Sequence, residues 1–71
     1  MPEDFVGKDL TGKNFAGANL TGAKLEEAYL GHADLTAANL TRATLTGANL
    51  ISSNVTDVIG ADFTGAILSP L

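Results

Sequence analysis

Residues 18–50 read ANLTGAKLEEAYLGHADLTAANLTRATLTGANL, and in this stretch a leucine recurs every five residues with an alanine two places before it. The same count runs upstream through Phe5, Leu10 and Phe15 and downstream to Val55. After Val55 the phase changes, and we expect the apolar residues Val58, Phe63 and Leu68 to resume the count three residues late. Almost the whole chain is therefore one five-residue repeat.

A five-residue apolar period fits no straight element. On a helix, five steps of about 100° rotate each leucine ~140° from the one before it, so the leucines would spiral around the axis. On a flat strand, an odd spacing sends successive leucines to opposite faces. A backbone that bends after every unit brings all of them to one shared axis. The period therefore predicts an all-β solenoid whose coils stack as short parallel β rungs.

The units Ala18–Gly22, Ala33–Ala37 and Ala38–Arg42 resemble the A(D/N)LXX motif of the pentapeptide-repeat family, and the resemblance extends over roughly residues 3–68. It implies a right-handed quadrilateral parallel β-helix with four units per coil, here about three and a half coils. Members of this family are common in bacteria and abundant in cyanobacteria, so the resemblance suggests such a source. With four units per coil, residues twenty apart would stack, for example Leu20 under Leu40.

Seventy-one residues allow one small domain, which we divide into three parts. Residues 1–17 are a divergent first coil, predicted to be a cap because Glu3, Lys8 and Lys13 replace the alanines. Residues 18–55 carry the regular repeats, and residues 56–71 form a phase-shifted C-terminal coil or cap. The step from Val55 to Phe63 leaves two interpretations open: a three-residue bulge at one corner, or a shortened corner with Val58 pointing inward.

The polar residues of the repeat fit the bends between its sides. Asp or Asn usually precedes the central leucine, where a short side chain can accept a hydrogen bond from nearby backbone. Gly is frequent two places after it, which suits a tight corner. We therefore attribute these residues to the fold.

Composition limits the function. The net charge of -4, with eight acidic and only four scattered basic residues, opposes direct binding to nucleic acid or to anionic lipid. No stretch has the apolar length of a membrane span and the N-terminus has no signal-peptide pattern, so we expect a soluble, cytoplasmic protein. With no cysteine and His32 as the single histidine, we expect no enzyme activity, no metal site and no cofactor.

One departure from the repeat is the candidate partner surface. Tyr29 takes a place usually held by Asp or Asn, and Ile51 takes one usually held by Thr. With their neighbours they could form an aromatic anchor with a polar rim, a combination that carries binding energy at interfaces. Ordinary drift on an exposed surface is the alternative. The candidate residues are Glu26, Glu27, Tyr29, His32 and Ile51.

The C-terminal coil is apolar and nearly uncharged, with Ile59, Ile67, Leu68 and Leu71 as its candidate edge residues. We weigh a self-folding cap against an interface, which would be a homodimer contact or a junction to another domain.

Two functions remain. The first is a non-enzymatic interaction module, a rigid solenoid that presents flat faces to a protein partner. The second, implied by the resemblance, is an acidic DNA mimic that binds and inhibits a bacterial type II topoisomerase, DNA gyrase. About three and a half coils at ~4.8 Å spacing give only ~17 Å, about half a turn of duplex. This length favours the interaction module.

Overall fold

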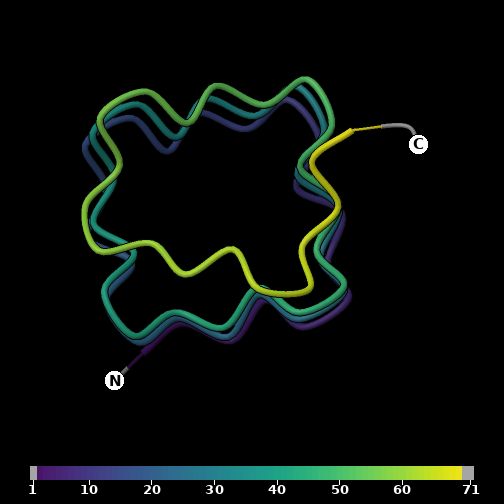
Figure 1. Cartoon of the computed structure of the whole chain (residues 1–71), viewed down its shortest axis with the longest axis horizontal. Helices are drawn as coiled ribbons and strands as arrows, with labels where there is room; N and C mark the ends of the chain where they lie inside the picture. The colour runs from purple at the N-terminus through teal and green to yellow at the C-terminus, as the bar shows by residue number, and fades with distance from the viewer. Residues whose placement is uncertain (1, 70–71) are drawn as a thin grey trace.

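The structure, a computed structural model, describes residues 2–69. Figure 1 looks along the axis of a four-sided coil whose successive turns lie over one another with a right-handed winding. The molecule measures 31 × 21 × 20 Å, and the coil axis runs along the shortest of these dimensions. The predicted right-handed quadrilateral β-helix is confirmed, but as a squat block that is no longer than it is wide.

Neighbouring coils pair through one residue per unit, always in parallel and in most cases twenty residues apart. Within residues 2–69 the structure contains no helix and no strand longer than a single bridging residue, and therefore no helix that could span a membrane. The bridging pairs are Asp4–Lys24, Asp9–Tyr29, Asn14–Asp34, Asn19–Asn39, Lys24–Thr44, Tyr29–Asn49, Asp34–Asn54, Asn39–Ile59 and Asn49–Ile67. The twenty-residue register confirms the predicted stacking.

The core is a set of leucine and alanine columns around the axis. The bridging residue points outward, so the next residue, the central leucine, points inward by the alternation of an extended backbone. The fully buried leucines are Leu25, Leu30, Leu35, Leu40, Leu45 and Leu50. The alanines two places before them, from Ala23 to Ala48, are buried as well. Small residues are needed at this second inward place because the coil leaves little room between its leucines.

The corners form as the sequence predicts. Asn39 is typical: its Oδ1 accepts hydrogen bonds from the backbone N–H of Thr41 at 3.0 Å and from the Thr41 hydroxyl at 2.6 Å. Two places after each central residue the backbone is left-handed. Six glycines take this conformation there, and Glu27, His32, Ala37, Arg42, Ser52 and Asp57 take it with φ between 59° and 65°. A non-glycine residue there costs about 1–2 kcal/mol.

The phase change lies later in the chain than predicted. Val58 does not resume the leucine count: it is half-buried at the alanine place above Ala38, and Ile59 still pairs with Asn39. By Ile67, which pairs with Asn49, the spacing has fallen to eighteen residues. In the coil below, Thr41 and Arg42 form this corner between Leu40 and Ala43. In the last coil Gly60 lies above Leu40 and is followed directly by Ala61, which lies above Ala43. Of the two interpretations left open, the shortened corner with Val58 pointing inward is confirmed: the corner lacks two residues, and in Figure 1 the last turn passes inside the outline of the coils below it.

The first coil closes the other end of the core with aromatic rings. Phe5 and Phe15 lie on opposite sides of the coil, and their ring centroids are 5.9 Å apart at an interplanar angle of 56°. The larger rings fill space for which no further coil supplies a leucine. Glu3, Lys8 and Lys13 stand exposed around them, so charged side chains surround this end.

Candidate functional site

One flat side of the coil carries most of the residues singled out from the sequence, and we call it the Tyr29 face. Two columns of side chains define it: Asp9, Tyr29, Asn49 and Ile67 in the first, and Thr11, Gly31 and Ile51 in the second. The backbone groups along these columns pair with the coils above and below, as when Tyr29 N–H donates to the Lys8 carbonyl at 2.8 Å. A partner on this face would therefore contact side chains.

Tyr29 and Ile51 form the apolar part of this face. Tyr29 pairs with Asp9 below and Asn49 above, as predicted, and its side chain is 55 % exposed. Ile51 lies one coil above Gly31, where a Cβ would be 3.5 Å from the Ile51 carbonyl oxygen. Because Gly31 has no side chain, the surface between the tyrosine and the isoleucine is open.

The three polar residues of the predicted surface are divided among different parts of the coil. Glu27 and His32 occupy the two corners that bound the Tyr29 face, both with φ 61°. Glu26 lies on the neighbouring side, where its Oε1 accepts a hydrogen bond of 2.7 Å from the Thr44 hydroxyl. This hydrogen bond is the main reason why the pKa of Glu26 is lowered. Glu26 is therefore part of the adjoining side and not of the Tyr29 face.

The predicted C-terminal edge is also divided. Ile59 and Ile67 are bridging residues, so their side chains project from the sides of the coil, 53 % and 44 % exposed. Leu68 occupies the leucine place above Leu50 and is 51 % exposed because no further coil covers it within residues 2–69. Leu71 lies outside the described residues. The uncovered end of the core is formed by Leu68 with the half-buried Val55, Val58 and Phe63.

Sequence reasoning missed that Ile67 belongs to the Tyr29 face. It lies in the column of Tyr29 and Asn49, at the coil's C-terminal end. The place of Ile67 depends on the two residues lost at Gly60, because an unbroken five-residue count would put another residue above Asn49. The face thus carries three large apolar side chains: Tyr29, Ile51 and Ile67.

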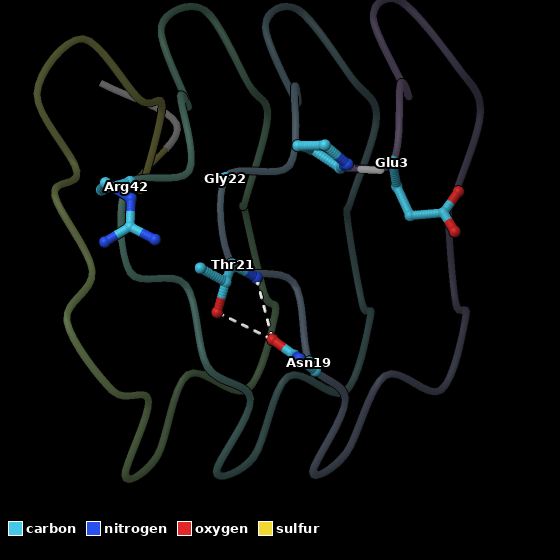
Figure 2. Close-up of a pocket in the computed structure, with 6 residues that line it drawn as sticks. Glu3, Asn19, Thr21, Gly22 and Arg42 are labelled. Atoms are coloured by element: carbon cyan, nitrogen blue, oxygen red, sulfur yellow. Dashed lines mark hydrogen bonds between the residues drawn. The ribbon is translucent and has the colours of Figure 1, made fainter.

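A second feature that the sequence did not reveal is a hollow of about 410 Å³ at the corner of Gly22. Figure 2 shows Arg42 and Glu3 at opposite ends of it, with Thr21 and Gly22 between them. Its lining residues are Pro2, Glu3, Asn19, Thr21, Gly22 and Arg42. The sequence feature that could have predicted the hollow is the twenty-residue spacing of Gly22 and Arg42. This spacing places the long cationic side chain of Arg42 above a glycine, which has no side chain.

Four of the eight carboxylates, those of Asp4, Asp9, Asp34 and Asp62, accept hydrogen bonds that hold the corners. Hydrogen bonds from the hydroxyl and backbone N–H of Thr36 lower the pKa of Asp34, and Thr11 and Thr64 do the same for Asp9 and Asp62. Within residues 2–69 no group of three or more His, Asp or Glu side chains is arranged to hold a metal ion.

Comparison with known structures supports the fold. HetL, a pentapeptide repeat protein involved in heterocyst differentiation regulation from the cyanobacterium Nostoc sp. strain PCC 7120, superposes with a TM-score of 0.74 at 27 % sequence identity. The match covers 94 % of this chain but 41 % of HetL, so the chain spans about two fifths of that protein. A pentapeptide repeat protein from the thylakoid lumen of Arabidopsis thaliana is 30 % identical over 90 % of this chain and 60 % of its own, with a TM-score of 0.36.

Sequence comparison identifies the family. No curated protein is similar enough to count as a match. The profile for pentapeptide repeats matches in eight copies, over residues 4–36 and 28–69, which is nearly the whole chain. Proteins of this kind are generally non-enzymatic structural repeat proteins. Together with the four-sided coil, this match shows that the chain belongs to the pentapeptide-repeat family.

Proposed function

We propose that this protein is a non-enzymatic interaction module that binds a protein partner through the Tyr29 face. The observation that carries the proposal is the exposed tyrosine in a column otherwise occupied by Asp9, Asn49 and Ile67. Tyrosine is among the residues most often responsible for binding energy at interfaces, because it buries a large ring and keeps a polar tip. The part played by HetL in regulating differentiation is compatible with such a role.

The chemistry of the face defines the partner. Tyr29, Ile51 and Ile67 provide apolar contacts, and Asp9 and Glu27 add negative charge at the edge of the same side. A complementary partner surface would be apolar at its centre and basic at its rim. The whole molecule, with a net charge of -4, would also attract such a partner from a distance.

The size of the face limits its affinity. One side of the coil, taken as 21 Å wide and 20 Å high, has an area of about 400 Å². This is roughly half of the ~800 Å² that each partner of a standard interface buries. Binding through this face alone is therefore expected to be weak and transient. A tighter complex would need the partner to fold around a corner and include Glu27 or His32.

The dimensions favour this role over DNA mimicry. The coil is 20 Å along its axis, which corresponds to about six base pairs of duplex at ~3.4 Å each. A mimic would inhibit supercoiling by DNA gyrase, and an interaction module would leave it unchanged. A supercoiling assay with an excess of the protein separates the two functions.

A second copy of the chain is a further partner that we propose, through the uncovered C-terminal end of the core. Leu68 with Val55, Val58 and Phe63 gives this end an apolar surface, whereas the opposite end has the charged Glu3, Lys8 and Lys13 around its phenylalanines. A pairing of N-terminal ends would have to remove these charged side chains from water. The C-terminal end is therefore the side through which two copies would associate.

The experiment that tests the Tyr29 face compares three immobilised proteins: wild type, Tyr29→Ala, and Thr41→Ala on the opposite side of the coil. A partner retained by wild type from a lysate of the source organism is purified and its affinity for each is measured. We expect Tyr29→Ala to weaken binding by about thirtyfold or more, as for a hot-spot residue, and Thr41→Ala to change it less than about threefold. Equal affinities of wild type and Tyr29→Ala would contradict the proposal.

A further inference from the structure

We propose that the hollow beside Arg42 is a binding site for a carboxylate group, separate from the Tyr29 face. The first reason is the space around Arg42. Below it in the corner column is Gly22, which has no side chain, and above it the corner is missing because Gly60 leads directly to Ala61. The Arg42 side chain is exposed, and the hollow below it reaches Pro2, whose Cγ would be 3.4 Å from a Cβ at Gly22.

The second reason is the set of hydrogen-bond donors. The carboxylate hydrogen bonds within residues 2–69 come from threonines and from backbone N–H groups, and Arg42 donates none of them. Its guanidinium can therefore form the two parallel hydrogen bonds with which arginine binds a carboxylate. Figure 2 shows this guanidinium beside Thr21, at the end of the hollow farthest from Glu3.

Asn19 adds a second donor to the same hollow. Its Oδ1 accepts hydrogen bonds from the Thr21 backbone N–H at 3.2 Å and from the Thr21 hydroxyl at 2.7 Å. Because these bonds fix the oxygen toward the turn, the Nδ2 amide hydrogens are left to donate outward. Arg42 and Asn19 line the same 410 Å³ hollow, so one carboxylate could accept hydrogen bonds from both.

Glu3 determines which carboxylates fit. It lines the opposite end of the hollow and would repel a second negative group there. A ligand with one carboxylate and a neutral or cationic far end is therefore preferred to a dicarboxylate. The required chemistry is that of a small zwitterion or of the free C-terminus of a peptide.

The test is a nuclear magnetic resonance titration of the ¹⁵N-labelled protein with γ-aminobutyrate, with glutarate, and with butylamine as a probe that has no carboxylate. We expect γ-aminobutyrate to shift the Arg42 Nε–H and Asn19 side-chain resonances in one saturable step. Glutarate should bind more weakly, and butylamine should leave both resonances unchanged. The variant Glu3→Gln should bring the affinity for glutarate close to that for γ-aminobutyrate.

Two variants, each lacking one positive charge, distinguish a specific binding site from general electrostatic attraction. Arg42→Gln should weaken γ-aminobutyrate binding about tenfold or more, since it removes the paired donors. Lys13→Gln removes one positive charge from the first coil, outside the hollow, and should leave binding within about twofold. Thermal unfolding of both variants confirms that they are folded. Absence of a saturable shift, or an equal loss in the two variants, would overturn the proposal.

A last titration identifies the source of the carboxylate. N-acetyl-tetraglycine presents the free C-terminus of a peptide without a second charge. Shifts of the same Arg42 and Asn19 resonances by this peptide would support the site and extend it to protein chain ends. Binding of γ-aminobutyrate alone would support the site and restrict it to small molecules.

Discussion

Gly60 lies directly against Thr41 of the coil below: a Cβ added at Gly60 would be 2.5 Å from the Thr41 Oγ1 and 3.2 Å from its Cα. This contact marks the place where the last coil loses two residues and crosses inside the outline of the lower coils. The same shortened corner leaves Arg42 uncovered and brings Ile67 into the column of Tyr29. One glycine thus connects the end of the repeat to both proposed surfaces.

The contact gives a direct prediction for Gly60→Ala. Both Gly60 and Gly12 have left-handed backbone, with φ of 66° and 72°, but a Cβ at Gly12 meets nothing within 4 Å. Gly12→Ala should therefore lower the free energy of unfolding by the conformational cost alone, about 1–2 kcal/mol. Gly60→Ala adds a steric clash, for a total of about 2–4 kcal/mol. Urea unfolding measures both, and equal losses would show that the last coil does not turn close to Thr41.

Neighbouring alanines test the orientation of the side chains. Ala38 is fully buried at the inward place, and Ala37 is exposed at a corner. Ala38→Leu should overpack the core and reduce stability by about 1–3 kcal/mol. Ala37→Leu should change it by less than about 0.5 kcal/mol, because its backbone is already that of a non-glycine residue. An unchanged melting temperature for Ala38→Leu would be incompatible with the described core.

Acid should weaken the protein through its corner aspartates. The pKa of Asp34 is lowered from 3.8 by hydrogen bonds from Thr36. The stability that this ionised group contributes is thus present above pH 3.8 and is lost as the pH falls below that value.

Exchanging acid and amide at two corners tests this effect. Asp34→Asn keeps a side-chain acceptor and should make the free energy of unfolding depend less on pH in the acid range. Asn39→Asp should make it depend more, because Asn39 also accepts from a threonine N–H and its stacked neighbours Asn19 and Ile59 are uncharged. Urea unfolding at several pH values between neutral and strongly acidic measures both slopes. Parallel curves for the two variants would rule out this contribution.

The apolar C-terminal end of the coil leads to a prediction about the mass of the protein in solution. If two copies associate through Leu68, light scattering should give the mass of a dimer, and Leu68→Glu should give a monomer because it places a charge on the uncovered core. Ile59→Glu, on the side of the same coil, is the matched control and should leave the dimer intact. A wild-type monomer at all concentrations would refute association through this end.

The five-residue period predicted most of the fold because it constrains every unit in the same way. Leu25, Leu30 and Leu35 can all reach one axis only if the chain bends between them, and Asn39 shows the bend chemistry that the sequence implied. The number of sides came from a resemblance, since periodicity alone does not contain it. The last corner could not be placed from the sequence, because Val58 fits an alanine place and a leucine place equally well until the pairing of Ile59 is known.

The candidate site was predictable only in part. Tyr29 and Ile51 are visible as departures from the repeat, and the twenty-residue register confirmed their neighbours. The register also separates Glu26 from Tyr29 and Ile51. Glu26 comes just before the corner residue Glu27, so it lies on the neighbouring side of the coil. The hollow at Arg42 escaped prediction because it results from what is missing: a side chain at Gly22 and a corner above Arg42.

Both proposed surfaces depend on the twenty-residue register, which disulfide formation can test most directly because the chain contains no cysteine. Lys24 pairs with Thr44, and parallel neighbours at ~4.8 Å are within the ~4.4–6.8 Å range of bonded cysteines. Lys24→Cys with Thr44→Cys should close an intramolecular disulfide under mild oxidation, seen as a mass loss of about 2 Da for the two hydrogens removed. Lys24→Cys with Asn39→Cys, or with Asn49→Cys, should stay reduced. Closure of either control pair in preference to the first would mean three or five units per coil and would contradict the account.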